Sequence, residues 1–228
     1  MGLVNPSDAC CNPVELVGML RARCGCPVLE GQEVLGIDDA GGALSVRITD
    51  GVVNAGRVLI ATNAYAGMLS PLLASVVSAR RGQMLAIRSE GRTLSMNYYA
   101  NHGSEYFREG YEGTLVFGGC RAAFADQEVG YEDRPTAAVQ EAIERFACDV
   151  LGAARVDVVA RWTGVMGFSP DGLPLVGPVS GPGWSDRVWY CGGFTGHGMS
   201  LAHRTAALAV EQMMGGAAGP FPLARVLS

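Results

Sequence analysis

One stretch of the chain constrains its fold more than any other: a short apolar run, a glycine-rich turn and a helical pattern over residues 187–214. Four glycines lie among positions 192–198. Glycine lets the backbone approach a flat ligand closely, and the turn would bring that ligand to the positive end of a helix dipole. Such a turn, taken alone, more often serves tight packing than binding. The pattern predicts an α/β unit, with a ligand site as one of two explanations for the turn.

The rest of the chain mixes both element types. A helix is predicted from Pro13, because a proline in the first turn precedes apolar residues at helical spacing. Short β-rich runs separated by glycine and aspartate follow over residues 27–62. Residues 79–161 alternate strand-like runs with one clear helix, 137–151, which indicates α+β character.

Composition excludes several classes of function. The 228 residues are 49% hydrophobic, enough for a sizeable core, and the formal charge of −5 comes without a basic run that could follow nucleic acid. No apolar stretch approaches the length of a membrane span. The seven cysteines are an odd number, and Cys24-x-Cys26 lacks a second Cys/His pair at zinc spacing. We expect a cytoplasmic protein in a reducing compartment, without a metal site, a nucleic-acid partner or a membrane span.

Three further motifs accompany the turn, and their order is specific. Residues 61–65 read ATNAY, residues 80–83 read RRGQ and residues 161–178 read RWTGVMGFSPDGLPLVGP. Together with the turn they resemble the FAD-dependent oxidoreductases of the D-amino-acid-oxidase and glycine-oxidase superfamily. The resemblance extends over residues 12–214.

The resemblance implies a partial FAD-binding domain, Rossmann-like and of the glutathione-reductase type, interleaved with an antiparallel-sheet substrate domain. The expected fold class is therefore α/β with α+β character. We expect the partial FAD-binding domain over residues 1–78, the substrate domain over 79–160, a return to the FAD-binding domain over 161–214 and a C-terminal tail over 215–228.

The front of the chain departs from the superfamily. Its members open with a strand, a Gly-x-Gly-x-x-Gly turn and a helix that hold the FAD diphosphate, and that glycine spacing is absent from this sequence. Three explanations remain open: the chain is a fragment of a longer protein, a separate chain supplies the segment, or the domain no longer binds FAD. We favour the fragment, because residues 3–6 read as a chain entered in mid-domain.

Carried over residue by residue, the resemblance places one set of residues at the cofactor. The backbone of Val34 would meet the adenine, residues 61–63 would lie beside the ADP moiety, and residues 193–200 would flank the isoalloxazine. If the turn only packs, Gly198→Ala would lower stability through a disfavoured φ. The expected cofactor-binding residues are Val34, Ala61, Thr62, Asn63, Gly164, Gly193, Phe194, Thr195, Gly196, Gly198, Met199 and Ser200.

Two residues are candidates for catalysis. His197 resembles the histidine near the substrate in sarcosine-oxidase-like members, although a lone histidine is equally a structural residue. The stretch 161–178, with residues 106–108, is more like γ-glutamylputrescine-type amine oxidoreductases. In that pattern Arg108 would bind a remote carboxylate. An arginine solvated at the end of an edge strand is the alternative.

Three absences narrow the chemistry. Where glycine-oxidase-like members carry an arginine that clamps the substrate carboxylate, this chain has residues 166–168, Met-Gly-Phe, so an α-amino acid held in that way is disfavoured. Where the sarcosine-oxidase branch attaches FAD through a cysteine, Gly164 stands, so FAD should be non-covalent. That branch also uses a lysine to promote reaction with O₂, and this chain has none. The electron acceptor therefore stays open.

These inferences predict an FAD-dependent oxidoreductase. The α-carbon of an amine or amino acid would give a hydride to flavin N5, leaving an imine that water hydrolyses. No strong acid or base is required, because the protein contributes positioning and electrostatics. A small-molecule amine or amino acid is the expected partner. The alternatives are a non-catalytic fragment or subunit that acts as an interaction module, and a dehydrogenase that passes electrons to a quinone.

Overall fold

The computed structural model describes residues 3–7, 9–180 and 184–227. The chain divides into two compact units, Met1–Gln32 and Glu33–Ser228, and each is described by itself. Among the described residues, none of the helices has both the length and the apolar character that crossing a membrane requires.

The first unit contains the helix predicted from Pro13, α1 (Pro13–Arg23). The Asn12 side chain caps it by accepting a hydrogen bond from the Val14 amide at 3.0 Å. The helix buries none of its residues, and apolar side chains such as Val14 and Leu20 are exposed. Capping and an ion pair between Arg21 and Glu30 are therefore its local supports.

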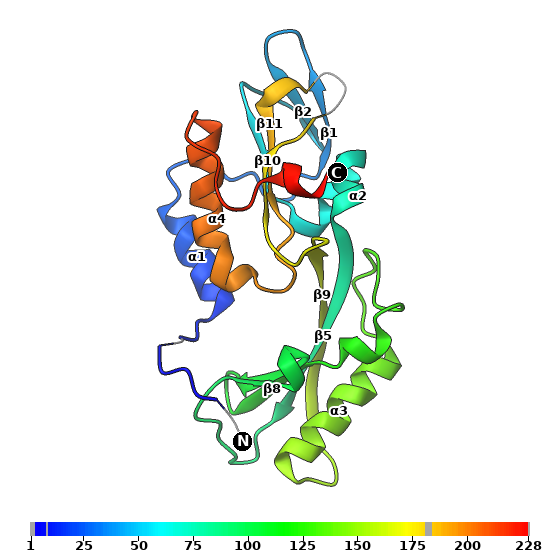
Figure 1. The fold of residues 1–228 in the computed structure, drawn as a ribbon. Coiled ribbons are helices and arrows are strands. Elements are labelled where there is room, and N and C mark those ends of the chain that lie inside the picture. The colour runs from blue at the N-terminus through cyan, green and yellow to red at the C-terminus, as the bar shows by residue number, and fades with distance from the viewer. Residues whose placement is uncertain (1–2, 8, 181–183, 228) are drawn as a thin grey trace. The chain divides into compact units, whose positions relative to one another are not determined.

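The second unit begins with a three-stranded antiparallel sheet in the order β1-β2-β3 (Figure 1). The hairpin turn between the second and third strands is Thr49-Asp50, because Ile48 pairs with Gly51. The indole N–H of Trp184 donates to the Ile37 carbonyl at 2.8 Å, and Ile37 and Leu44 join the main hydrophobic core. The strands are β1 (Val34–Asp39), β2 (Leu44–Ile48) and β3 (Gly51–Ala55).

A second three-stranded sheet has the order β10-β11-β4. β4 (Val58–Ile60) and β11 (Val188–Gly192) are parallel, so their carboxyl ends lie at the same edge of the sheet. β10 (Leu175–Pro178) pairs antiparallel with the other side of β11. β4 is thus an outer strand, and its second side pairs with no other strand of the described chain.

Helical segments follow both parallel strands. After β4 come the 3-10 helix η1 (Asn63–Met68) and α2 (Pro71–Val76), which Ser70 caps and Pro71 begins. After β11 comes α4 (Gly198–Met213), which packs on β10 and β11. The helix that the sequence predicts after the glycine-rich turn is therefore present.

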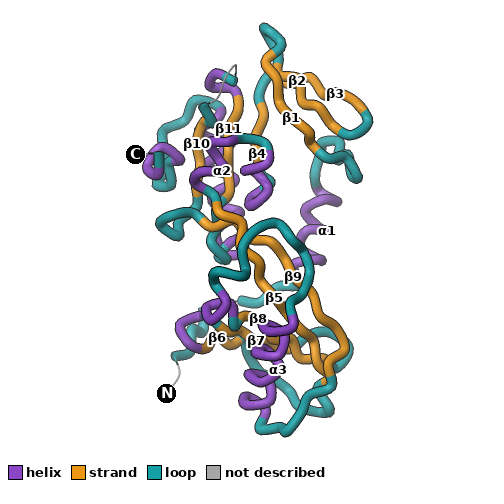
Figure 2. The backbone as a smooth tube through the Cα atoms, turned by 90° about the vertical axis from the view of Figure 1, so that its right-hand side faces the viewer, coloured by secondary structure: helices purple, strands orange, loops and turns teal. Residues whose placement is uncertain are grey.

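A five-stranded antiparallel sheet has the order β6-β7-β8-β5-β9 (Figure 2). One face packs against α3 (Ala137–Leu151), where Leu85, Phe117 and Ile143 are fully buried. Gly152, at φ 60, ends this helix. The strands are β5 (Ser78–Arg88), β6 (Tyr98–Ala100), β7 (Glu105–Glu109), β8 (Thr114–Gly119) and β9 (Val158–Phe168). The remaining 3-10 helices are η2 (Asn101–Gly103), η3 (Arg121–Phe124), η4 (Ser185–Arg187) and η5 (Leu223–Val226).

The mixed architecture confirms the predicted fold class. Two antiparallel sheets accompany one small sheet that contains the parallel pair β4 and β11. The predicted boundary after residue 78 falls at the start of β5, and the one after residue 160 falls inside β9. The domain boundaries themselves stay predictions.

Candidate functional site

Two motifs far apart in the sequence meet at the edge where β4 and β11 end. The Gly193 amide donates to Oδ1 of Asn63 at 2.9 Å across 130 positions of the chain. The hydroxyl of Tyr190, a buried residue of β11, donates to the Asn63 carbonyl oxygen at 3.1 Å. The ATNAY turn and the glycine-rich turn therefore form one structure.

Each of these turns holds a non-glycine residue in the left-handed region of φ. Asn63 has φ 47 and Thr195 has φ 51. Asparagine tolerates this conformation, whereas a β-branched threonine is strained there. The Thr195 amide donates to the Gly167 carbonyl at 2.9 Å, and Oγ1 of Thr195 accepts from the Ser169 amide at 3.2 Å. These bonds hold the strained turn against the end of β9, as is common at functional sites.

The glycines of the site differ in what they permit. Gly196 has φ 85, and an added Cβ would meet no heavy atom within 4 Å. Gly164 likewise faces open space, without a positive φ. Gly198, the first residue of α4, has no positive φ, and its Cβ would make only ordinary contact with Phe194 at 3.6 Å. The expectation of a disfavoured φ at Gly198 is therefore wrong.

The start of α4 lies at the surface. His197 is its N-cap and makes no capping hydrogen bond with its side chain. The first amides of a helix have no partner within the helix, and the dipole makes this end positive. His197, Met199 and Ser200 are exposed, and the Ser200 hydroxyl donates to the His197 carbonyl at 3.0 Å. This end of α4 can therefore stabilise a negatively charged edge of a bound molecule.

The five-stranded sheet has one face that α3 does not cover, which we call the open face. Strand register places Tyr106, Gly118, Met84 and Trp162 side by side across β7, β8, β5 and β9. Alternation along the strands puts these residues on the side opposite to Phe117 and Leu85, which pack on α3. Gly164 follows Trp162 on the open face, which thus combines aromatic side chains with an open position.

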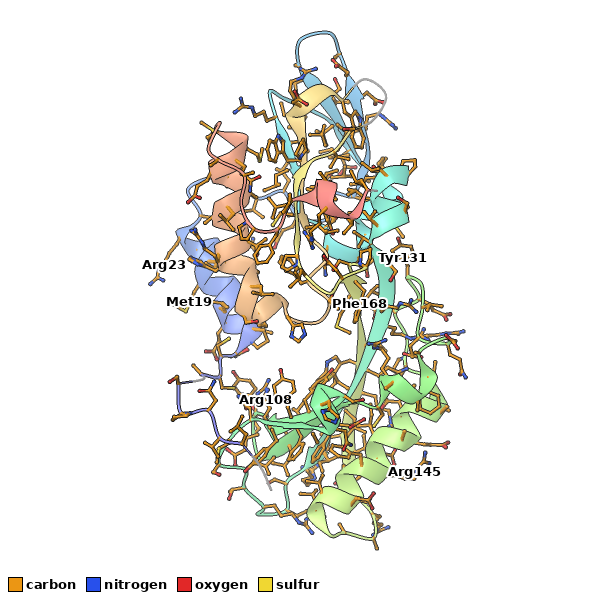
Figure 3. The ribbon with its side chains drawn as sticks, in the orientation of Figure 1. Met19, Arg23, Arg108, Tyr131, Arg145 and Phe168 are labelled. Atoms are coloured by element: carbon orange, nitrogen blue, oxygen red, sulfur yellow. The ribbon has the colours of Figure 1, made fainter. Side chains whose placement is uncertain are left out.

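β9 links the open face to the glycine-rich turn. Phe168, its last residue, makes an antiparallel bridge with Phe194 of the turn. The guanidinium carbon of Arg121 lies 4.7 Å from the centre of the Phe168 ring. Figure 3 shows Phe168 at the end of β9, near the sheet formed by β10, β11 and β4. Arg108 lies in the more distant part of the five-stranded sheet.

Arg108 also lies on the open face, but far from Gly164. In the register it shares a row with Val116 and Ala86, four residues along the strands from the row of Gly164. Four residues correspond to about 13 Å, and β7 is three strands away from β9. Arg108 is one residue beyond the pairing with β6, and its guanidinium donates to the Glu109 carbonyl at 2.8 Å. A ligand at Gly164 would have to be long to reach Arg108.

The remaining predicted residues divide between two places. Ala61 and Thr62 are exposed at the end of β4, next to Asn63. Val34 is the first residue of β1 and belongs to a different sheet, so no strand pairing joins it to the site. The structure brings Asn63, Gly193 and Thr195 together by hydrogen bonds, and leaves Val34 and Arg108 at other positions.

Comparison with known proteins identifies the chain. The family model described as DAO, FAD dependent oxidoreductase, matches residues 1–212. The chain belongs to this family. The sequence resemblance is thereby confirmed, and FAD is the cofactor that the family description names.

Relatives of this DAO-family chain include the "Probable oxidoreductase OrdL" of Rhizobium meliloti, 31% identical over 214 residues, which cover 90% of this chain and 47% of the relative. A glycine oxidase of Pseudomonas aeruginosa is 29% identical over 190 residues, which cover 82% of this chain and 50% of the relative. The chain thus spans about half the length of the curated relatives it matches. The fold is similar to that of glycine oxidase from Geobacillus kaustophilus, with a TM-score of 0.67, 21% identity and coverage of 89% of this chain and 53% of that structure.

Several residues at the candidate site were not predicted from the sequence. Gly167 lies against Asn63, where an added Cβ would approach Oδ1 within 2.6 Å, and Ser169 bonds to Thr195. Both belong to the 161–178 motif, so their position was a usable signal. Arg121 had no such signal, because it follows β8 outside any of the motifs and reaches Phe168 only in the folded chain.

Proposed function

We propose that this chain contributes the flavin-facing and substrate-facing parts of an FAD-dependent oxidoreductase that oxidises the C–N bond of an amine or amino acid. The observation that carries the proposal is the Asn63–Gly193 hydrogen bond, which joins two motif turns at the end of a parallel strand pair. The crevice at the carboxyl ends of parallel strands is where α/β sheets bind their ligands. Membership of the DAO family supports FAD as that ligand.

The residues present fit a flat ring system. Gly164 and Gly196 leave open space where any side chain would intrude, and the exposed start of α4 is electrically positive. When bound there, FAD would accept the hydride from the carbon next to the substrate nitrogen. The amides at the start of α4 would stabilise negative charge at the N1–C2=O edge by about 0.3–2 kcal/mol. Gly164 offers no thiol, so attachment would be non-covalent.

The substrate would lie on the open face of the five-stranded sheet, and a small-molecule amine or amino acid is the proposed partner. Tyr106 and Trp162 supply aromatic surface there. His197, exposed at the start of α4, is the proposed catalytic neighbour of the substrate. Arg108 would bind the distant carboxylate of an extended substrate such as a γ-glutamyl amine. A cytoplasmic location remains a prediction.

A complete FAD site needs a cradle for the diphosphate, and no Gly-x-Gly-x-x-Gly spacing is present here. We propose that a strand-turn-helix segment pairs with the free side of β4, either as further residues of the same protein or from a separate chain. β4 offers unpaired backbone groups on that side among the described strands. The 228-residue chain by itself should therefore retain less than one FAD per molecule.

The test compares two glycine substitutions in FAD titrations followed by flavin fluorescence. Gly164→Leu would fill the proposed ring position, and Gly56→Leu is the matched control, since both glycines face open space without a positive φ. We expect Gly164→Leu to weaken FAD binding and Gly56→Leu to leave it unchanged, with equal stability in both variants. Equal FAD affinity in the wild type and Gly164→Leu would contradict the proposed ring position. Anaerobic dye reduction with a panel of amines and amino acids then tests the activity of the FAD-loaded protein.

A further inference from the structure

Arg121 places a positive charge at the junction of the open face and the glycine-rich turn. It begins η3, with one residue between it and the end of β8, and its guanidinium carbon lies over the Phe168 ring at 4.7 Å from the ring centre. Phe168 in turn bridges to Phe194. This cation–π contact uses none of the five N–H donors of the guanidinium.

Within the described part of the chain, the Arg121 guanidinium has neither an ion pair nor a hydrogen bond, although the residue is half-buried. Burial and the nearby charge of Arg80 lower the pKa of Arg121, and Tyr106 and Glu128 act in the opposite direction. Arg80 also lacks an ion pair there; it donates to Oγ of Ser78 and to the Ala125 carbonyl, both at 3.3 Å. Two neighbouring arginines are therefore left without a carboxylate.

The carboxylates nearby are already bound. Glu128 accepts from Arg81 at 2.8 and 2.9 Å, and Glu132 lies 3.5 Å from the same guanidinium. These bonds point to the covered side of the strand, because Arg81 and Arg80 alternate along β5. Backbone pairing of Arg80 with Val129 and of the Arg81 amide with the Glu128 carbonyl holds the segment that follows Arg121 in place. The unpaired arginines, Arg80 in β5 and Arg121 in η3, therefore lie on segments that backbone pairing holds in place.

We propose that Arg121, with Arg80 beside it, binds the carboxylate of an amino-acid substrate on the open face next to the glycine-rich turn. This inference rests on the proposed function and narrows its substrate from amines in general to amines that carry a carboxylate. Partly buried arginines keep their charge, and donors removed from water without a partner are costly, so a ligand carboxylate supplies what the protein leaves open. A planar carboxylate matches the fork of a guanidinium in a bidentate pair.

The position of Arg121 also changes the conclusion that was drawn from the absence of an arginine at Met166. The sequence disfavours an α-amino acid because residues 166–168 contain no arginine. In the folded chain Arg121 reaches that same strand end from another segment, over Phe168. A carboxylate there would lie near the turn, whereas the row of Arg108 lies eight residues, about 26 Å, further along the strands. The two arginines therefore select different substrates: Arg121 a compact amino acid and Arg108 an extended one.

The test measures carboxylate binding without turnover. Propionate is titrated into the chain against n-propylammonium chloride at the same ionic strength, and the Nε–H signals of the arginines are followed by NMR. We expect saturable shifts at Arg121 and Arg80 with propionate only. Arg121→Gln should weaken binding about tenfold or more, Arg121→Lys should weaken it less, and the control Arg145→Gln, at an exposed position of α3, should leave it unchanged.

Absence of saturable binding to the wild-type chain would overturn the proposal, as would equal affinity in Arg121→Gln with its fold intact by circular dichroism. A role in packing alone would lower the melting temperature of Arg121→Gln without altering propionate affinity. The outcome is independent of the cofactor, because failure of FAD to bind contradicts the proposed function and leaves the propionate titration readable. With FAD loaded, propionate should also perturb the flavin absorption in the wild type and lose this effect in Arg121→Gln.

Discussion

Arginines occur on both faces of the five-stranded sheet, but they are paired on one face and, within the described chain, lack a carboxylate partner on the other. On the face that packs on α3, Arg81 binds Glu128 with both side chains less than 5% exposed, and Arg161 binds Gln140 and Glu144 of the helix. Gln83 completes this network by donating to Glu128 at 2.8 Å and to Thr136 at 2.7 Å. On the open face, Arg80 and Arg121 have no carboxylate partner among the described residues.

This difference in pairing distinguishes arginines that stabilise the fold from arginines that are available to a ligand. A buried arginine inside the protein is tolerated when every donor is used, and it then fixes the position of the segments it joins. An arginine left unpaired at an open face contributes little to folding and is available to a ligand. Within one sheet, pairing rather than residue type therefore indicates which arginines support the fold and which remain available to a ligand.

The strongest way to break this comparison is to remove a partner on the covered face. Glu128→Gln leaves the Arg81 charge buried without its carboxylate, and we expect the free energy of unfolding to fall by about 3–5 kcal/mol. Denaturant unfolding measures the loss. The matched control is Glu144→Gln, because the Arg161–Glu144 pair is about a third exposed and should contribute less than about 1 kcal/mol. Equal losses in the two variants would show that burial does not distinguish these pairs.

The Arg81–Glu128 pair also predicts in which direction stability changes with pH. Burial raises the pKa of Glu128, but hydrogen bonds from Arg81, Gln83 and Thr136 and the charge of Arg81 outweigh it and leave the pKa below its usual value. A lowered carboxyl pKa gives stability that is present above the unfolded pKa and is lost as pH falls through the folded one. The stability difference between wild type and Glu128→Gln should therefore shrink below about pH 4. A difference that grows in acid would contradict this sign.

A smaller effect is expected where the two motif turns meet. Asn63→Ala removes the acceptor of the Gly193 amide and places alanine at φ 47, so unfolding free energy should fall by about 2–3 kcal/mol. Asn63→Asp keeps the acceptor and a tolerated conformation, and should lose less. FAD binding should weaken in the alanine variant. An alanine variant as stable as the aspartate variant would mean that the joint between the turns carries no strain or buried donor.

The sequence predicted the fold class and the main helices because periodicity and glycine position report local structure. It also predicted the family, since motifs at residues 61–65, 80–83 and 161–178 keep their order around the turn. It could not find Arg121, whose role depends on a contact between η3 and the end of β9. It also misjudged Gly198, because a glycine in a turn looks the same in sequence whether its φ is positive or helical. A long-range contact decided the first case and the backbone conformation decided the second.

The smallest expected effect on stability belongs to Gly198→Ala, and it tests the open side of the comparison. The added Cβ begins a helix and contacts only Phe194 at 3.6 Å, so unfolding free energy should change by less than about 0.5 kcal/mol. The matched control is Gly177→Ala on β10, whose Cβ would press on Leu223 at 3.0 Å and lower stability. Denaturant unfolding compares the two variants.

Sulfite titration of the FAD-loaded protein then shows what the turn does. If the amides at the start of α4 face the N1–C2=O edge, the Cβ at Gly198 displaces the ring from the positive end of the helix. Sulfite binding at N5 and the reduction potential should then both fall, because each depends on stabilising negative charge at that edge. Gly177→Ala should leave sulfite affinity unchanged despite its lower stability. The reverse pattern, with unchanged sulfite affinity in Gly198→Ala, would mean that the glycines of the turn serve the fold and that the ring lies elsewhere.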